Sequence, residues 1–202
     1  MKGSSIYTIV YSAVLGIVCA LLLTGVSTLT EPYRKANAAA EKMRNILHVL
    51  GVPFSAKESA EELIRIYEKS ISEEQYGALR VYVYDGAIAV PFSDLGRCGL
   101  IKGFLALESD KRTIRGVTFY EQEETPGLGG EIGAKWFTDQ FKAKTIFGPD
   151  GQPGIRIVRG GGASETNEVD GITGATMTCN KVQAMLNGAI EEIVEEFTEN
   201  VQ

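Results

Sequence analysis

The 202-residue sequence has one histidine and three cysteines, and this scarcity excludes several kinds of site. No two cysteines are spaced as C-x-x-C, and an odd number of cysteines does not form a disulfide framework. The single histidine, His48, cannot build a metal site of the three-histidine kind. No G-x-G-x-x-G or G-x-x-x-x-G-K-[ST] motif occurs. We therefore predict no metal site, no catalytic constellation and no nucleotide fingerprint.

Charged side chains are nearly missing from the start of the chain. Between Lys2 and Glu31 there is no Asp, Glu, Lys, Arg or His. The apolar run Ile6–Leu29 would make a helix of about 36 Å at 1.5 Å per residue, enough to cross a hydrocarbon core of roughly 30 Å. A cleaved signal peptide is the alternative, but its cleavage site would follow a shorter apolar core closely, and Ala38–Ala40 is too distant. We predict an uncleaved transmembrane anchor.

The remainder of the chain is acidic. It holds 19 Lys and Arg residues against 26 Asp and Glu residues, a formal net charge of −7. Such a body would repel nucleic-acid phosphates, so we predict no nucleic-acid partner. The basic residues Arg34, Lys35, Lys42 and Arg44 outnumber Lys2 on the other side of the run. Counted alone, they would keep the body in the cytoplasm.

Hydrophobic periodicity predicts the elements of the body. Helical patterns occupy Lys35–Leu50 and Ser55–Ser70, and the period changes to two after Ala78. Asp85-Gly86 lies between β-branched and aromatic runs and predicts a hairpin. At least four antiparallel strands follow from this pattern. The individual segments that we predict beyond that hairpin are strands at Leu100–Glu108, Thr113–Tyr120 and Gly154–Arg159, and helices at Lys135–Lys144 and Thr176–Phe197.

The predicted fold class is α+β, with a single N-terminal transmembrane helix followed by one antiparallel-sheet domain with flanking helices. The anchor is expected over residues 1–30 and the domain over residues 31–202.

The stretch Asp170–Thr178 (DGITGATMT) directly precedes the last predicted helix. A small-residue loop that leads into a helix N-terminus presents free N–H groups to an anion. Thr173, Thr176 and Thr178 add hydroxyls, and Gly174-Ala175 let a large partner approach the backbone. The stretch fits a site for a phosphate-type ligand, although an ordinary threonine cap of the helix is an alternative interpretation.

A second stretch, Glu124–Gly130 (ETPGLGG), contains a tight turn at Thr125-Pro126-Gly127 because proline fixes φ and glycine supplies a positive φ. Leu128 is then presented at the tip of a loop. From the residues alone, a structural turn and a ligand-contacting loop are equally good interpretations.

The two stretches together resemble the FMN-binding domain family. VDGITGATMT is similar to the [ST]-G-A-T-x-T flavinylation motif, and YEQEETPGLGGEI with KWFTDQFKAK is similar to the second hallmark. The resemblance implies that Thr178 carries FMN through a phosphoester bond, installed from FAD by a Mg²⁺-dependent flavin transferase. Cys179 offers a thiol alternative, but the motif frame favours Thr178.

The resemblance also implies roles for the neighbouring residues. Gly174 and Ala175 would keep the acceptor hydroxyl reachable, and Thr176 would bind the phosphate or cap the helix. The loop Glu124–Leu128 is expected to lie near the isoalloxazine ring, with Thr125 and Leu128 in direct contact with it.

Within this family, the two motifs occur together in the C subunit of the Na⁺-translocating NADH:quinone reductase and in the G subunit of the Rnf complex. The resemblance therefore implies an electron-transfer subunit that relays electrons from an iron–sulfur donor to an FMN-bearing acceptor subunit. It implies an inner-membrane protein whose domain faces the periplasm or cell exterior, contrary to the charge count, although long domains translocate largely regardless of charge. We favour the reductase, with the Rnf complex as the alternative and a non-redox, membrane-anchored anion-binding module as the second alternative.

Overall fold

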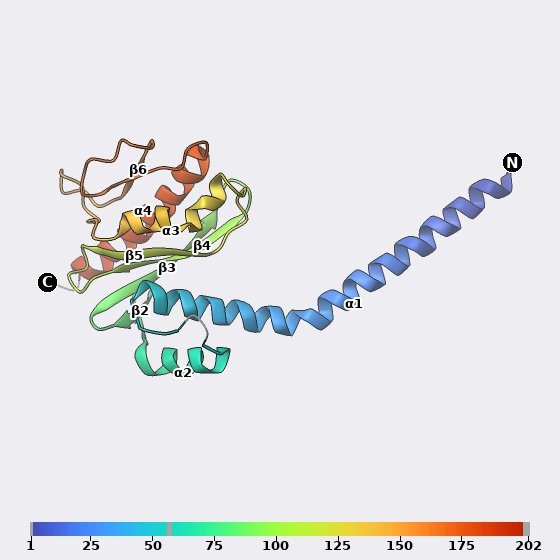
Figure 1. Ribbon diagram of the computed structural model, residues 1–202, viewed down its shortest axis with the longest axis horizontal. Helices are drawn as coiled ribbons and strands as arrows, with labels where there is room; N and C mark the ends of the chain where they lie inside the picture. Colours follow the sequence, from blue (N-terminus) through green and yellow to red (C-terminus); the bar gives the residue numbers. More distant parts are fainter. Residues whose placement is uncertain (1, 56–57, 200–202) are drawn as a thin grey trace. The chain divides into compact units, whose positions relative to one another are not determined.

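The computed structural model describes residues 2–55 and 58–199 (Figure 1). Its contacts divide the chain into two compact units, Met1–Ala40 and Glu41–Gln202. Each unit is described by itself.

The first unit consists of the greater part of helix α1 (Lys2–Val49). Among the described residues, α1 is the one helix long and apolar enough to cross a membrane, and its apolar side chains from Ile6 to Tyr33 are exposed. The sequence predicted a separate helix at Lys35–Leu50, but α1 continues through Pro32 without interruption. The residues after Pro32 are rich in Ala, Lys and Arg, which favour helix strongly.

The second unit is built on a five-stranded antiparallel sheet in which each strand pairs with the next along the chain. Asp85 (φ 49°) and Gly86 (φ 78°) form the predicted hairpin turn, because both adopt the left-handed conformation that such a turn requires. β4 and β5 confirm the two strands predicted after the hairpin. The strands are β1 (Ser72–Tyr76), β2 (Leu79–Tyr84), β3 (Ala87–Leu95), β4 (Leu100–Leu107) and β5 (Ile114–Glu121).

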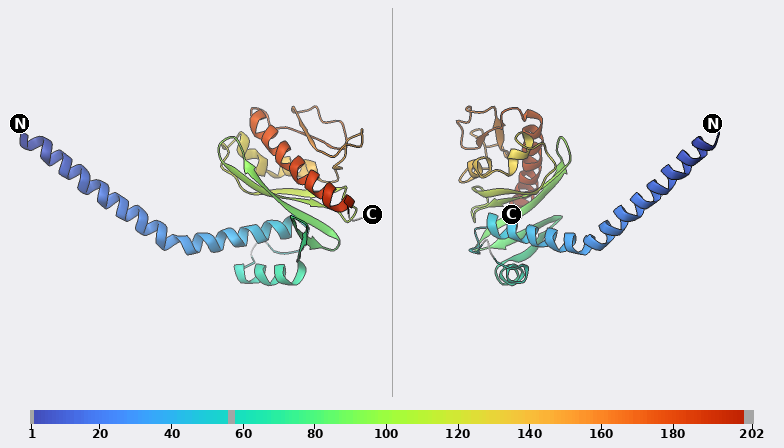
Figure 2. Two further views of the ribbon diagram at one scale, coloured as in Figure 1. Left: turned by 180° about the vertical axis from the view of Figure 1, so that it is seen from behind. Right: turned by 45° about the vertical axis from the view of Figure 1, so that its right-hand side comes forward.

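Both faces of the sheet are covered. One face buries Tyr82 and Phe104 beneath the end of α1 and helix α2 (Ala60–Ser70), which begins with a capping box at Ser59. The opposite face buries Val90 and Leu105 beneath helix α4 (Thr176–Glu199). Figure 2 shows α2 and α4 on opposite sides of the sheet. The predicted fold class, a long apolar N-terminal helix followed by an antiparallel-sheet domain with flanking helices, is confirmed.

The segment between β5 and α4 differs most from expectation. The predicted helix at Lys135–Lys144 is shorter, because Ala143 and Lys144 leave it to exchange backbone hydrogen bonds with Ile114 on the edge of β5. The predicted strand at Gly154–Arg159 is confirmed as β6, which pairs in parallel with a strand that the sequence did not predict. The elements of this segment are η1 (Gly129–Gly133), α3 (Lys135–Thr138), η2 (Asp139–Phe141), β6 (Arg156–Val158) and β7 (Glu168–Asp170).

Candidate functional site

The two stretches singled out in the sequence meet at the start of α4. Thr178, in the first turn of α4, is 2% exposed, and its Oγ1 donates a 2.7 Å hydrogen bond to Oε2 of Glu124 in the loop after β5. The two residues are 54 positions apart in the chain. The structure therefore brings together the expected FMN acceptor and the first residue of the loop that was expected near the ring.

The carboxylate of Glu124 is also held from its other side. Its Oε1 accepts hydrogen bonds from the backbone N–H groups of Arg97 (2.7 Å) and Cys98 (2.9 Å), at the tip of the β3–β4 hairpin. Burial acts to raise the pKa of Glu124, but the hydrogen bonds from Thr178, Cys98 and Arg97 outweigh it and hold the pKa below the usual value of 4.5. Glu124 is thus an ionised carboxylate, and both of its oxygens accept hydrogen bonds.

Two glycines allow this close packing. A Cβ at Gly129 would lie 2.6 Å from both Thr178 Oγ1 and Glu124 Oε2, so the backbone of Gly129 covers the hydroxyl. Gly174 has a φ of +79°, and a Cβ there would lie 3.0 Å from Cδ2 of Leu128. Position 174 therefore favours glycine for two reasons: other residues rarely adopt that φ, and glycine has no Cβ to press against Leu128.

The turn predicted in the Glu124–Gly130 loop is confirmed. The carbonyl of Thr125 accepts hydrogen bonds from the N–H groups of Leu128 (3.1 Å) and Gly130 (2.9 Å), and Gly127 has a φ of +73°. The side chain of Thr125 is exposed, with its Oγ1 3.7 Å from Sγ of Cys98. Ring contact by this loop stays a prediction.

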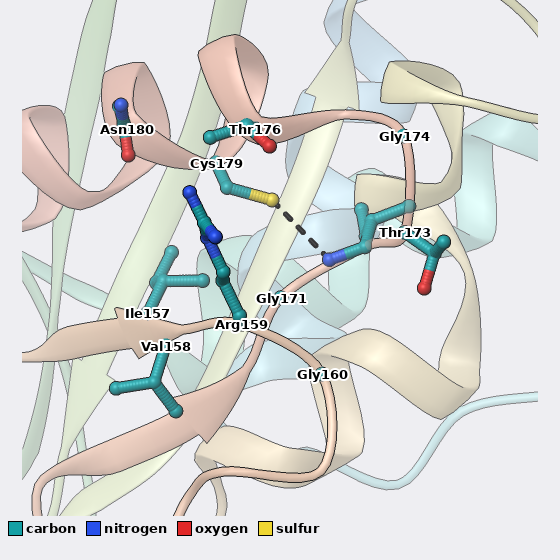
Figure 3. Close-up of a pocket in the computed structure, with 11 residues that line it drawn as sticks. Ile157, Val158, Arg159, Gly160, Gly171, Thr173, Gly174, Thr176, Cys179 and Asn180 are labelled. Atoms are coloured by element: carbon teal, nitrogen blue, oxygen red, sulfur yellow. Dashed lines mark hydrogen bonds between the residues drawn. The ribbon is translucent and has the colours of Figure 1, made fainter.

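Thr176 and Ala175 do not join the Glu124–Thr178 pair. Ala175 is buried, with its N–H bonded to the carbonyl of Ile172. Thr176 faces a cavity of about 420 Å³ on another side of α4, shown in Figure 3. The polar side chains that line this cavity are Arg159, Thr173, Thr176, Cys179 and Asn180, and Thr178 is not among its lining residues.

The thiol of Cys179 is a poor substitute for the acceptor hydroxyl. Its Sγ accepts a hydrogen bond from the N–H of Ile172, drawn as a dashed line in Figure 3. Burial raises the pKa of Cys179, and the backbone hydrogen bonds only partly oppose this. A buried thiol with a raised pKa is a weak nucleophile because little of it is thiolate.

The sequence did not identify Arg97 and Cys98 as part of the site. They contribute only backbone N–H groups, which every residue except proline has, so their residue types do not indicate this role. The one available signal is their position between Gly96 and Gly99, which form a tight turn closed by the hydrogen bond from Gly96 N to Gly99 O. Arg159 and Asn180 in the cavity were also missed.

A family model described as "FMN-binding domain" matches residues 96–191. This stretch of the chain belongs to the FMN-binding domain family. The matched domain contains both partners of the Glu124–Thr178 hydrogen bond, the N–H groups that hold Glu124, and the cavity beside α4.

Relatives of this chain share one name. The chain is 29% identical, over 84% of each chain, to the C subunit of the Na(+)-translocating NADH-quinone reductase from Vibrio alginolyticus. A match at 42% identity to the subunit of the same name from Yersinia pestis covers 50% of this chain and 38% of that relative. The crystal structure of the subunit from Parabacteroides distasonis has a TM-score of 0.68 and 28% identity, covering 82% of this chain and 94% of that one.

Proposed function

We propose that this protein is the FMN-carrying C subunit of a Na⁺-translocating NADH:quinone reductase, with FMN joined to Thr178 by a phosphoester bond. The observation that carries the proposal is the position of Thr178: its hydroxyl lies in the first turn of α4, inside the matched domain, and faces the Glu124–Gly130 loop. The names of the relatives favour the reductase over the Rnf complex.

Once the hydrogen bond from Thr178 to Glu124 is broken, the residues at this site fit an attached FMN. The first N–H groups of a helix and its dipole favour a phosphate at the N-terminus of α4. Gly129 and Gly174 keep Cβ atoms away from the hydroxyl and from Leu128. When bound, FMN supplies one-electron chemistry that no amino-acid side chain at this site provides. The protein supplies the attachment, the position of the ring and its surroundings.

The role in the complex follows from this assignment. The protein would relay electrons from an iron–sulfur donor to an FMN-bearing acceptor subunit, and a flavin transferase would load it during maturation. α1 would cross the inner membrane once, with the domain on the periplasmic or exterior side. The exposed apolar side chains along α1 support a membrane location, because exposing so long an apolar surface to water is unfavourable.

The acceptor is tested by co-expressing the chain with a flavin transferase and illuminating a denaturing gel with ultraviolet light. Wild type is expected to give a fluorescent band whose mass is increased by one FMN phosphoester. Thr178→Ala should give a dark band, Thr178→Ser should restore fluorescence, and Cys179→Ser should leave it unchanged. A fluorescent Thr178→Ala band would overturn the assignment, and a dark wild-type band would contradict covalent FMN altogether.

A further inference from the structure

The outer edge of the five-stranded sheet at β5 is covered along only part of its length. β5 is the last strand of the sheet, so one side of its backbone has no neighbouring strand. At its start, the N–H of Ile114 donates to the carbonyl of Lys144 (2.7 Å), and the N–H of Ala143 donates to the carbonyl of Ile114 (2.9 Å). From Gly116 to Tyr120, no backbone hydrogen bond joins β5 to a segment other than β4 in the described part of the chain. This stretch is therefore an open strand edge.

The open stretch of β5 lacks the features that usually protect an edge. Gly116–Phe119 pairs with β4 without a register shift and contains no charged side chain. β1, the strand at the other edge of the sheet, is short and carries Glu73 and Glu74. Charged side chains on an edge strand discourage pairing with a further strand, whereas an uncharged edge is a template for it. β5 can therefore accept an added strand more readily than β1.

A groove of about 440 Å³ follows this edge, because its lining includes every residue from Arg115 to Phe119. One wall is the end of α1 with Gly51 behind it, and the guanidinium of Arg115 lies against this wall: a Cβ at Gly51 would be 3.3 Å from Nη2. The other wall is α3 and η2, with Lys135 in α3 and Lys142 directly after η2. Figures 1 and 2 show α3 and the end of α1 on opposite sides of β5. This space is referred to as the β5 groove.

The β5 groove carries an excess of positive charge, although the protein has a net charge of −6. Arg115 has its carboxylate partner, Glu108, outside the groove lining and at a long distance of 3.6 Å. On the other wall, Lys135 and Lys142 both bind the carboxylate of Asp139, at 2.5 and 2.6 Å. One carboxylate cannot neutralise two ammonium groups. Each wall of the groove therefore presents a cation to an acidic group that enters it.

We propose that the β5 groove binds an extended acidic segment of a partner polypeptide, which adds a strand to the sheet along Gly116–Phe119. Consecutive side chains of an added strand point to opposite sides, so two adjacent acidic residues would reach Arg115 on one wall and Lys135 or Lys142 on the other. A strand edge presents both N–H donors and C=O acceptors, a pattern that another strand matches and a simple anion does not. The inference does not depend on the attachment of FMN.

Binding of the capped peptide TVTEETVT to the full chain, purified in detergent, tests the proposal. Hydrogen–deuterium exchange locates the peptide: exchange within Gly116–Phe119 should slow at saturation, and exchange within Ser72–Tyr76 of β1 should not change. Arg115→Gln and Lys142→Gln should each weaken binding about fivefold, which is the upper range for an exposed ion pair. Lys69→Gln, which changes an exposed lysine of α2 outside the groove, is the matched control and should bind as wild type does.

Two further peptides separate the two parts of the proposal. TVTQQTVT should bind about fivefold more weakly or worse, because it lacks the charges. TVTEETVT N-methylated at its central residues should not bind, because it cannot donate hydrogen bonds to the strand edge. Equal binding of TVTQQTVT would overturn the acidic specificity, and equal binding of the N-methylated peptide would overturn strand addition.

Three other outcomes would also overturn the proposal. One is unchanged exchange within Gly116–Phe119 at every peptide concentration. Another is an equal loss of binding in Lys69→Gln, which would show a general effect of charge. The third is equal slowing of exchange by inorganic phosphate, which would make the groove a site for a small anion. FMN attachment is measured separately by the fluorescence of the gel band, so either proposal can fail without the other.

Discussion

The hydroxyl of Thr178 and the carboxylate of Glu124 are joined by a buried 2.7 Å hydrogen bond between two segments that are far apart in the chain. A phosphoester at Thr178 would remove the proton that Glu124 accepts and place a negative phosphate beside an ionised carboxylate. Both effects are unfavourable at this distance. Attachment of FMN would therefore have to break this hydrogen bond, by rotation of the Thr178 side chain or by movement of the Glu124–Gly130 loop, and Glu124 covers the acceptor in the unmodified protein.

Glu124 should make the stability of the unmodified protein dependent on pH. Its folded pKa lies below its usual value of 4.5, so its stabilising effect is complete above that value and is lost as the pH falls through the folded pKa. Glu124→Ala should lower the free energy of unfolding by about 2–3 kcal/mol near neutral pH, because three hydrogen-bond donors lose their acceptor. The difference should shrink steadily in acid. Urea unfolding at several pH values measures it.

Glu124→Gln is the matched control for charge. The amide keeps the volume and an acceptor oxygen but cannot titrate, so this variant should lack the component of the acid dependence that Glu124 contributes. Identical acid profiles for wild type and Glu124→Gln would show that the carboxylate is not the group that titrates.

Local signals in the sequence were sufficient for the elements that depend on neighbours in the chain. The Asp85-Gly86 turn and the start of α4 at Thr176 follow from short motifs, and both are confirmed. The end of the helix that starts at Lys135 was wrong because Ala143 pairs with Ile114, a contact between distant segments. The hydrophobic period and the helix propensity of a segment do not indicate which distant segment it pairs with.

The same limit applies to the site. Thr178 and Glu124 were both selected through family resemblance, but Glu124 was expected beside the ring rather than bonded to the acceptor hydroxyl. A motif identifies the residues of a site, but which of them contact one another can be determined only from the folded structure.

Gly129 should tolerate no side chain. Gly129→Ala places a Cβ 2.6 Å from Thr178 Oγ1 and Glu124 Oε2, so one of these groups must move. We expect a loss of about 1–3 kcal/mol in the free energy of unfolding, as is usual for overpacking. Gly133→Ala is the matched control in the same 3₁₀ helix, because its Cβ meets no atom within 4 Å. Its effect should stay within about 0.5 kcal/mol. Equal effects of the two substitutions would contradict the close packing over the hydroxyl.

The second unit should fold without the first. A chain starting at Glu41 retains Ile46 and Leu47 of α1 and Leu50 directly after it, all of which are buried against the sheet. It should be soluble without detergent and unfold cooperatively. A chain starting at Gly51 lacks these three side chains, each worth about 2 kcal/mol or more, and should not fold. Thermal unfolding followed by circular dichroism distinguishes the two, and a folded Gly51 chain would show that the end of α1 is dispensable.

Labelling of a single thiol, that of Cys98, can determine on which side of the membrane the domain lies. Of the three cysteines, Cys98 is exposed in the domain, Cys19 lies in the apolar part of α1, and Cys179 is buried with a raised pKa. A membrane-impermeant maleimide should therefore modify Cys98 alone, and Cys98→Ser should abolish labelling. If the domain lies outside the cytoplasm, intact spheroplasts will be labelled as fully as lysed ones. Labelling only after lysis would instead support the charge count of Arg34, Lys35 and their basic neighbours, and would place the domain in the cytoplasm.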